Sequence, residues 1–574
     1  MNKKLSRSFP ILEWLGGYKK EYLSGDISAG ITVGIMLIPQ GMAYAMIAGL
    51  PPVYGLYASI VPQLIYALLG TSRKLSVAPV AMDSLLVAAG VSVLATEGTA
   101  AYISFAILLS FFMGLFQWGL GVVRMGFITN LLAKPVISGF TSAAALIIGL
   151  NQLKHLLGIS LEKSNNVFEI LYSAIQNIGG THILTLVIGV FGIVIIKSVK
   201  RISASIPAAL VAVIFGTLAV YFLGLEAKGV SIVKDIPDGL PSFILPDFSL
   251  GQLGEVIPLA LTISIVAFME SFSVSKAIEA KKKDHKVRPN QELIALGMAN
   301  VIGSLFQSYP VTGGFSRSAV NYQGGANTPL ASIVSAILVG LTLLFLTPLF
   351  YFLPKAILAS VIMVAISSLI DIAYAKELWK TNKIEFVLLF STFMITLNFS
   401  MVPGIVSGIV LSILILLYRQ AYPHIAKLGR VKGHHDFRNI KRFRDLEKWN
   451  EYLILRMDAP LTFVNIQYFK DYISREIEYN PQIQKVLIDA SPISNIDASA
   501  LIGLKELIDT LQEQKIELVL ADVVGPVRDI LKQNQLIEKI GEDNFFLDLH
   551  KAIQYLTCKE KGSQKEIVLQ TEVN

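Results

Sequence analysis

Long apolar stretches separated by short polar segments recur along the first three quarters of the chain. A helix needs about 20 mostly apolar residues to cross a bilayer. Fourteen stretches are candidates, seven on each side of the polar segment 226–249. They begin near Ile27, Tyr54, Pro79, Tyr102, Lys134, His182 and Ile206, and then near Ile257, Gln291, Phe315, Thr328, Ile357, Ile384 and Val402.

The third stretch of each half is too short to cross a bilayer alone. One follows the irregular segment 76–81, and the other follows 309–314. Short segments interrupted by Pro or Gly, at matching positions of two halves, indicate a transporter binding site. Because an odd number of crossings reverses orientation, the pattern predicts fourteen transmembrane segments arranged as an inverted 7+7 repeat.

Loop charge gives the predicted orientation. Lysine and arginine concentrate in the loops that follow the even-numbered spans, above all in the loop at 276–288. Since cytoplasmic loops carry the excess of these residues, we expect both ends of the spanning region in the cytoplasm.

The pattern changes to that of a soluble α/β domain after Tyr422. Strand-like runs at 452–456, 486–488 and 516–521 alternate with helical periods at 464–476, 498–514 and 525–534. Strands that alternate with helices predict a sheet covered by helices. The predicted divisions are a cytoplasmic N-terminal segment (1–24), a transmembrane anion-transport domain (25–425), a basic linker (426–450), the cytoplasmic α/β domain (451–558) and a flexible tail (559–574).

Composition narrows the class of protein. The 574 residues are 53% hydrophobic and 16% charged, with a mean hydropathy of +0.59. A soluble domain has roughly 25% charged residues, so a soluble enzyme or a nucleic-acid-binding protein is disfavoured. The lone cysteine, Cys558, excludes a disulfide framework, and His434 and His435 lack further ligands nearby. No phosphate-binding loop or catalytic elbow is visible, so we expect no enzyme activity, metal or cofactor.

The two half-helix starts predict an anion site. Irregular backbone at membrane depth is tolerated only against protein or a watery cavity, and each following helix carries about half a positive charge at its N-terminus. Arg317 adds a full charge in the first turn of the second half-helix, where Ser316 and Ser318 add hydroxyls. The alternative is that Arg317 pairs structurally or extends to an interface.

Two carboxylic acids in apolar surroundings are candidates for coupling to an ion. Glu270 lies within the eighth span, and Asp83 lies just inside the third. An intramembrane carboxylate must be protonated, paired or facing a cavity. Either could carry a proton or bind sodium, or instead act as a fixed partner of Arg317.

The first span contains a third set of candidates. Gln40 and Tyr44 share one face of a helix that Pro39 interrupts. They could wall a substrate pocket, or they could serve ordinary helix packing.

Several motifs in chain order resemble those of the sulfate permease (SulP) anion-transporter family. They are Gly25-Asp26-Ile27-Ser28-Ala29-Gly30, the segments 39–45 and 48–57, Gly70-Thr71-Ser72-Arg73, and the segment 312–321. The C-terminal part is similar to a STAS domain, with Leu487-Ile488-Asp489-Ala490 and the segment 496–501 at a strand and a helix start.

The resemblance implies a core and a gate domain built from two intertwined repeats, an elevator movement and a homodimer. It implies an anion held between the third and tenth spans, with candidate ligands Ala78, Val80, Ala81, Gly314, Phe315, Ser316, Arg317 and Ser318, and with Gln40, Tyr44 and Phe315 lining the pocket. A carboxylate at the Glu270 position is typical of proton-coupled members. Asp83 departs from the family pattern, as does Leu37, and Ser499 matches a phosphorylated serine of stand-alone STAS proteins.

We therefore expect secondary active transport of an inorganic oxyanion, most simply proton-coupled sulfate import in the plasma or inner membrane. The alternatives are a sodium-coupled bicarbonate or dicarboxylate transporter, an uncoupled exchanger or channel, and a membrane-anchored sensor. A proton or sodium ion, the lipid bilayer and a second copy of the chain are the expected partners, and no nucleic acid is expected.

Overall fold

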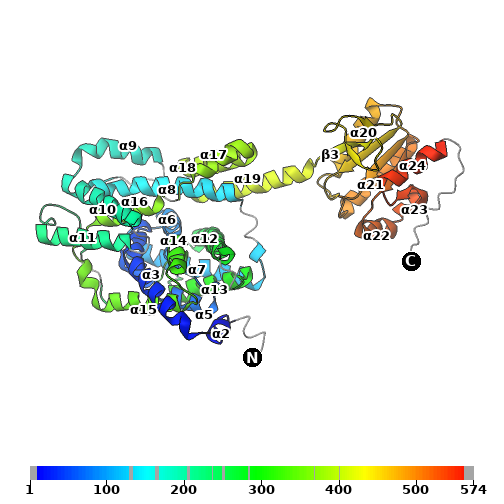
Figure 1. Cartoon of the computed structure of the whole chain (residues 1–574). Helices are drawn as coiled ribbons and strands as arrows, with labels where there is room; N and C mark the ends of the chain where they lie inside the picture. The colour runs from blue at the N-terminus through cyan, green and yellow to red at the C-terminus, as the bar shows by residue number, and fades with distance from the viewer. Residues whose placement is uncertain are drawn as a thin grey trace. The chain divides into compact units, whose positions relative to one another are not determined.

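The chain folds into a helical unit, Met1–Ser412, and an α/β unit, Ile413–Asn574 (Figure 1). The computed structural model describes residues 9–127, 133–161, 167–202, 207–234, 237–248, 253–281, 285–367, 369–399 and 401–560. The predicted tail at 559–574 lies outside these residues, apart from its first two positions, which belong to the last helix.

A helix lies at each of the fourteen predicted stretches. In the first half these are α3 (Lys20–Ile47), α4 with α5 (Val53–Tyr57, Val61–Leu69), α6 (Ala81–Val91), α7 (Ala100–Val122), α8 (Lys134–Leu157), α10 (Ile183–Ile202) and α11 (Ala208–Leu223). In the second half they are α12 (Leu253–Lys281), α13 (Pro289–Ser304), α14 (Phe315–Gln323), α15 (Leu330–Phe345), α16 (Lys355–Ile366), α18 (Lys383–Asn398) and α19 (Met401–Ala421). Additional short helices are α2 (Ile11–Leu15), α9 (Val167–Asn177) and α17 (Ile372–Thr381).

Six of the helices in the described ranges are long and apolar enough to cross a bilayer by themselves: α3, α7, α8, α10, α12 and α19. The helices α6 and α14 have only 11 and 9 residues, as the short third segment of each half predicts. At a rise of about 1.5 Å per residue, neither spans the roughly 30 Å of a hydrocarbon core. The count of fourteen crossings and their inverted repeat stay predictions.

The helices of this unit pack in two groups. In one group α3 packs on α15, and α7 packs on both α12 and α13. In the other, α8 packs on α18 and α16, and α10 packs on α16 and α11. The helix α3 also contacts α16 and α11 of the second group. Glycines permit the closest approaches, since a Cβ at Gly55 would overlap the backbone oxygen of Gly41.

The α/β unit has one mixed sheet in the order β4-β3-β6-β7-β8-β9, and β5 pairs with β3. The strands β6 (Tyr452–Met457), β7 (Lys485–Asp489), β8 (Glu517–Ala521) and β9 (Phe545–Phe546) are parallel. The helices α20 (Ile466–Tyr479), α21 (Ala498–Glu513), α22 (Gly525–Gln533) and α23 (Leu536–Ile540) share an apolar core with one face of the sheet, and α24 (Leu549–Glu560) covers the other. The predicted strands and helices are therefore confirmed.

One predicted boundary is wrong. Residues 426–450, expected to be a basic linker, contain most of β3 (Ile425–Val431) together with β4 (Phe437–Asn439) and β5 (Leu446–Glu447). The basic residues obscured the pattern, because they alternate with residues such as Ala426 and Leu428 that the sheet buries. The helix α3 likewise begins at Lys20, inside the segment predicted to precede the membrane domain.

Candidate functional site

The two irregular segments that precede α6 and α14 are joined by a short antiparallel ladder. In it β1 (Val77–Ala78) pairs with β2 (Thr312–Gly313), so that Val77 lies opposite Gly313. The Gly314 amide extends the ladder by donating a 3.1 Å hydrogen bond to the Ser76 carbonyl. Lipid cannot form hydrogen bonds with the amides and carbonyls of these irregular segments, and the ladder provides such bonds within the protein.

Hydrogen bonds with the neighbouring helices hold β2 and the residue that precedes it. The Thr312 hydroxyl donates to the Ala267 carbonyl of α12 at 2.7 Å, and the Ser271 hydroxyl oxygen accepts from the Gly313 amide at 2.6 Å. On α13 the Asn300 amide group both accepts from the Val311 amide and donates to its carbonyl. These buried contacts fix where α14 begins.

Arg317 bonds the two irregular segments to each other at the β1–β2 ladder, which we call the junction. Its Nη1 donates to the Pro79 carbonyl at 2.8 Å, and its Nη2 donates to the Ala78 carbonyl at 3.1 Å. The side chain is only 2% exposed. A Cβ at Gly314 would lie 2.8 Å from Nη2, so a glycine is needed for this guanidinium position. The sequence left two alternatives open, in which Arg317 extends to an interface or pairs with a carboxylate. The hydrogen bonds to two buried backbone carbonyls differ from both.

Both half-helices begin without a side-chain cap. Val80 precedes α6 and Gly314 precedes α14, and neither position provides a capping hydrogen bond. The first amides of both helices are therefore left to bind something else, and together with the helix dipoles they favour an anion.

These two helix starts face one cavity of about 400 Å³. Nine predicted site residues line it: Gln40, Tyr44, Val80, Ala81, Glu270, Gly314, Phe315, Ser316 and Arg317. Its opposite wall comes from the second helix group, through Ile196 and Lys200 of α10, Ala208 and Ala209 of α11, and Val361, Val364 and Ala365 of α16. Polar groups thus come mainly from one group of helices and apolar groups mainly from the other. In Figure 1, α6 and α14 lie between α3 and α12, which pack on both.

Three predicted residues do not line this cavity. Ala78 belongs to β1 and presents its carbonyl to Arg317. The Ser318 hydroxyl is buried and accepts a 2.9 Å hydrogen bond from the Ser76 amide. Asp83 is fully buried in the first turn of α6. Ala78 and Ser318 therefore hold the two half-helices together, and their role as direct anion ligands stays a prediction.

The acidic residues Glu270 and Asp83 are close enough for their charges to interact, and Glu270 also interacts with Arg317. Among the described residues, both carboxyl oxygens of Asp83 and Oε2 of Glu270 are buried without a hydrogen-bond partner. An ionised carboxylate in such a place is costly unless positive charge balances it. The role of these two residues in coupling to a proton or sodium ion stays a prediction.

Lys200 is a cavity residue that the sequence reasoning did not select. It lies in the last turn of α10 and is exposed. Its position near a predicted cytoplasmic loop explains why it was counted only as loop charge. Only the packing of α10 beside α16 brings it to the cavity.

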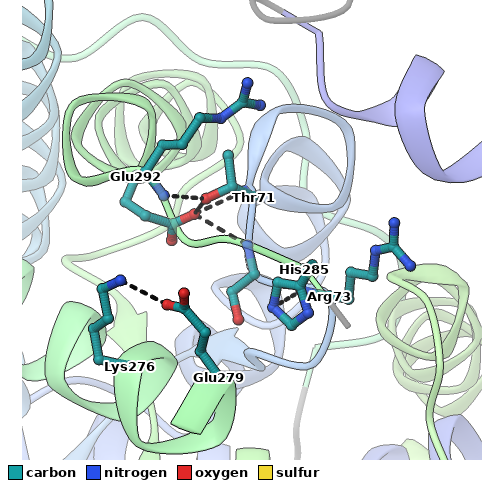
Figure 2. A network of polar contacts seen from close by, with 8 residues as sticks. Thr71, Arg73, Lys276, Glu279, His285 and Glu292 are labelled. Carbon is teal, nitrogen blue, oxygen red and sulfur yellow. Dashed lines mark hydrogen bonds and ion pairs between the residues drawn. The ribbon is translucent and has the colours of Figure 1, made fainter. Parts of the chain in front are cut away.

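Another buried carboxylate anchors the signature Gly70-Thr71-Ser72-Arg73, which leads into β1. Glu292 of α13 is fully buried and accepts from the Thr71 and Ser72 amides at 2.7 and 3.1 Å, and from the Tyr66 hydroxyl at 2.6 Å. Figure 2 shows its carboxylate against Thr71, with the Lys276–Glu279 ion pair and the contact of the Arg73 amide with His285 nearby. This network fixes the chain that enters the junction.

In the α/β unit, Ser499 is exposed in the first turn of α21. The cap of this helix is Asp497, which accepts from the Ala500 amide at 2.8 Å. Phosphorylation of Ser499 stays a prediction. No group of three or more metal-ligating side chains was found among the described residues.

Solved structures with this arrangement define the class of protein. The overall structure of SLC26A9 has a TM-score of 0.91 over 98% of this chain and 95% of its own, at 24% identity. Murine Slc26a9 in the inward-facing state has the same TM-score and identity over 97% and 95%. The transmembrane domain of the cyanobacterial bicarbonate transporter BicA has a TM-score of 0.60 over 69% of this chain and 98% of its own, at 21% identity. The chain is therefore a multi-pass helical membrane protein with a C-terminal α/β domain.

Sequence relatives give the family. The sequence model described as "Sulfate permease family" matches residues 23–392, and that of the STAS domain matches residues 439–552. Sulfate transporter 4.1, chloroplastic, of Arabidopsis thaliana is 37% identical over 95% of this chain and 82% of its own. High affinity sulfate transporter 2 of Stylosanthes hamata is 36% identical over 95% and 86%. The chain belongs to the sulfate permease family, whose members are transporters and not enzymes.

Proposed function

We propose that this protein carries sulfate across a membrane together with protons, with the anion bound between the starts of α6 and α14. The observation that carries the proposal is the pair of uncapped helix N-termini beside Arg317 in one cavity. Backbone amides, helix dipoles and a guanidinium form the kind of site that binds a tetrahedral oxyanion. The printed names of the curated relatives support sulfate as the anion.

Glu270 is the coupling group in this proposal. Its carboxyl lines the same cavity as Arg317 and has a buried oxygen without a partner among the described residues. When sulfate enters, it takes the place of the Glu270 carboxylate near Arg317 and the helix N-termini. The negative charge of sulfate repels the carboxylate, so the carboxyl group takes up a proton. When the proton leaves on the other side, the carboxylate displaces the anion.

Alternating access follows from the division of the cavity walls. The first helix group supplies the polar groups, and the second supplies a largely apolar surface opposite them. Sliding of the first group along the second would carry the anion from one side to the other, which is an elevator movement. The antiparallel β1–β2 pairing supports the inverted 7+7 repeat that this movement requires.

The membrane and the assembly are part of the same proposal. We place the protein in the plasma or inner membrane, although one relative in the comparison is named as chloroplastic. We place both ends in the cytoplasm, since the loops that follow the even-numbered spans carry most of the basic residues. We also propose that the protein forms a homodimer with its STAS domains in the cytoplasm.

A sodium-coupled transporter of bicarbonate or dicarboxylate is the alternative. The fold of the BicA transmembrane domain resembles that of this chain. The same carboxyl groups, with nearby hydroxyls, could ligate sodium, which binds oxygen ligands. The experiment therefore varies the proton and sodium gradients separately.

The test is uptake of radiolabelled sulfate into proteoliposomes. We expect uptake driven by an inward proton gradient at equal sodium on both sides, and no stimulation by a sodium gradient at equal pH. Glu270→Gln removes the titrating group and retains the size, so it should abolish accumulation while leaving sulfate exchange between equal concentrations. Glu279→Gln, which removes a carboxylate from the same helix outside the cavity, is the control.

Three results would contradict the proposal. If wild-type protein carries bicarbonate or a dicarboxylate but no sulfate, the substrate is wrong. If sulfate uptake follows sodium, or if Glu270→Gln accumulates sulfate as the wild type does, the coupling is wrong.

A further inference from the structure

A small basic cavity lies apart from the proposed transport site, where the N-terminal helix α2 meets the segment that leads into β1. Its volume is about 190 Å³. Its lining comes from three parts of the chain: Pro10, Glu13 and Trp14 at α2, then Gly70, Thr71 and Arg73, and then His285, Lys286 and Arg288 just before α13. Pockets for drug-sized molecules have about 300–1,000 Å³, so this cavity suits one small group.

Hydrogen bonds between distant segments fix the backbone around this cavity. The Thr71 hydroxyl oxygen accepts a 3.1 Å hydrogen bond from the Arg288 amide, and the Thr71 amide donates to the Glu292 carboxylate at 2.7 Å. The Arg73 amide donates to Nε2 of His285 at 3.4 Å (Figure 2). The basic side chains on the lining therefore extend from backbone that the fold holds in place.

Two residues of the lining have buried N–H donors without an acceptor. Nε1 of Trp14 and Nη2 of Arg288 are buried and have no hydrogen-bond partner among the described residues. Trp14 is only 6% exposed. The other terminal nitrogen of Arg288, Nη1, lies 3.3 Å from Oε1 of Glu13. Because indole and guanidinium groups can only donate, and because a buried unpaired donor costs free energy, a ligand here must be an acceptor.

The charge of the lining determines which acceptor fits. Arg73, Lys286 and Arg288 bring positive charge to the cavity, and the carboxylate of Glu13 offsets only part of it. Glu292 lies behind the lining, where its carboxylate already accepts several hydrogen bonds. An oxyanion supplies both the negative charge and several acceptor oxygens, and a guanidinium group binds phosphate oxygens in pairs.

The surroundings of the cavity are typical of a membrane–water interface. The ring of Trp14 lies edge-to-face against Tyr18, with centroids 6.5 Å apart, and Tyr18 lies likewise against Tyr22 at 6.1 Å. Tryptophan and tyrosine concentrate at the level of the lipid headgroups. The apolar helix α3 begins at Lys20, between these tyrosines. The loop at 276–288, which provides part of the lining, is the most basic of the predicted cytoplasmic loops, and basic pockets on that side bind anionic headgroups.

We propose that this cavity binds a phosphate group. Arg288 and Trp14 donate hydrogen bonds to its oxygens, and Arg73 and Lys286 balance its charge. The cavity shares no lining residue with the proposed transport site, so this inference goes beyond the proposed function. A bound phosphate joins α2 to the segment 70–73, and through it to the chain that enters the junction. The phosphate comes from a lipid headgroup or from free inorganic phosphate, and the test separates these two sources.

The test measures how ligands change the thermal stability of the purified full chain in dodecyl maltoside. One arm adds dioctanoyl phosphatidic acid, and its control is dioctanoylglycerol, which has the same acyl chains without the phosphate. The other arm adds inorganic phosphate, and its control is chloride at equal ionic strength. Because a ligand of the folded state stabilises it, we expect phosphatidic acid to raise the melting temperature and dioctanoylglycerol to leave it unchanged.

Three variants locate the effect. Arg288→Gln removes a charged donor and should weaken the apparent affinity roughly tenfold or more. Trp14→Phe keeps an aromatic ring but removes the N–H donor, and it should weaken the affinity roughly 3- to 10-fold. Arg201→Gln replaces an exposed arginine of α10 outside this cavity, so it should respond as the wild type does.

Fluorescence reports the same site directly. The chain has four tryptophans, and replacing Trp118, Trp379 and Trp449 by Phe leaves Trp14 as the single emitter. We expect its emission to change when phosphatidic acid is added and not when dioctanoylglycerol is added. This measurement tests the inference even if Arg288→Gln fails to fold.

The outcomes are distinct. A response to phosphatidic acid alone supports a lipid headgroup as the source, and a response to inorganic phosphate as well supports a site that also takes the free ion. The inference is overturned if neither ligand stabilises the wild type or changes the Trp14 emission, or if Arg288→Gln responds as the wild type does. None of these measurements depends on sulfate uptake, so their result stands even if the proposed function is wrong.

Discussion

The Arg317 guanidinium donates a 2.8 Å hydrogen bond to the carbonyl oxygen of Pro79, which lies 238 residues earlier in the chain. The contact joins the two half-helix starts and leaves Nε of Arg317 buried without a partner among the described residues. The arginine thus has two functions. It supplies positive charge to the cavity, and it holds the first half-helix in register with the second.

Replacing Arg317 by Lys should separate these functions. Lys retains the charge, but one ammonium cannot reproduce the planar pair of bonds to the Ala78 and Pro79 carbonyls. Leaving a buried carbonyl without its hydrogen-bond donor costs roughly 1–3 kcal/mol. We expect Arg317→Lys to lower the apparent affinity for sulfate at least tenfold and Arg317→Ala to abolish uptake.

Concentration-dependent uptake by proteoliposomes measures both effects. Arg201→Lys, on exposed α10, is the matched control and should resemble the wild type. Wild-type affinity in Arg317→Lys would show that the paired carbonyl contacts contribute nothing to the site.

Lys200 should affect the capture of the anion more than its binding. Because it is exposed at the cavity, its charge acts through water and attracts anions over a distance. We expect Lys200→Ala to raise the KM for sulfate roughly 2- to 5-fold at low salt, with little effect above about 0.3 M salt, where the Debye length is well below the roughly 8 Å of physiological ionic strength. Lys197→Ala, one turn earlier and outside the cavity, should leave KM unchanged. An effect independent of salt would instead indicate direct coordination of sulfate.

The contact between α3 and α4 should tolerate no added methyl group. A Cβ at Gly55 would overlap the Gly41 backbone, whereas a Cβ at Gly119 of α7 would meet nothing within 4 Å. We expect Gly55→Ala to destabilise the helical unit by about 1–3 kcal/mol or more, and Gly119→Ala to be neutral or slightly stabilising. Thermal unfolding in detergent, followed by the amount of monodisperse protein, compares the two. Equal melting temperatures would contradict the packing.

The α/β unit should lose stability in mild acid through His550. Burial, followed by the nearby His435 and Arg430, lowers the pKa of His550, whereas Asp548 opposes this effect. The rings of His435 and His550 lie 3.9 Å apart. Since the folded state binds the proton less readily than the unfolded state does, this stabilisation is complete above about pH 6.5 and is lost as the pH falls below that value.

Hydrogen exchange of β8 and α24 in the full chain, at pH 7.5 and 5.5, measures this loss. We expect a smaller difference between the two pH values in His550→Phe than in the wild type. His434→Phe, at an exposed neighbouring position, should behave as the wild type does. The role of His550 is rejected if its replacement leaves the pH dependence unchanged.

Much of the site was predictable from local sequence because its chemistry is local. The short segments before Ala81 and Phe315 identify two half-helices, and Arg317 follows directly in the second. Gln40 and Tyr44 were predicted from helical spacing and family resemblance, and both line the cavity. Lys200 was missed because its local sequence is that of an ordinary basic helix end. The strand β3 was missed because basic residues interrupt its apolar pattern.

The sequence by itself determined where the helices lie, that two of them are short, and that strands alternate with helices in the C-terminal unit. Each of these features follows from the local spacing of hydrophobic residues. Only the tertiary structure decided which groups face each other. It placed Ala78 and Ser318 outside the cavity lining and gave Arg317 two backbone partners instead of a carboxylate. It also left both carboxyl oxygens of Asp83 and Oε2 of Glu270 without hydrogen-bond donors in the described part of the chain. The reason is physical: the junction pairs residues more than 200 positions apart, and the direction of a side chain across such a contact depends on packing from both halves at once.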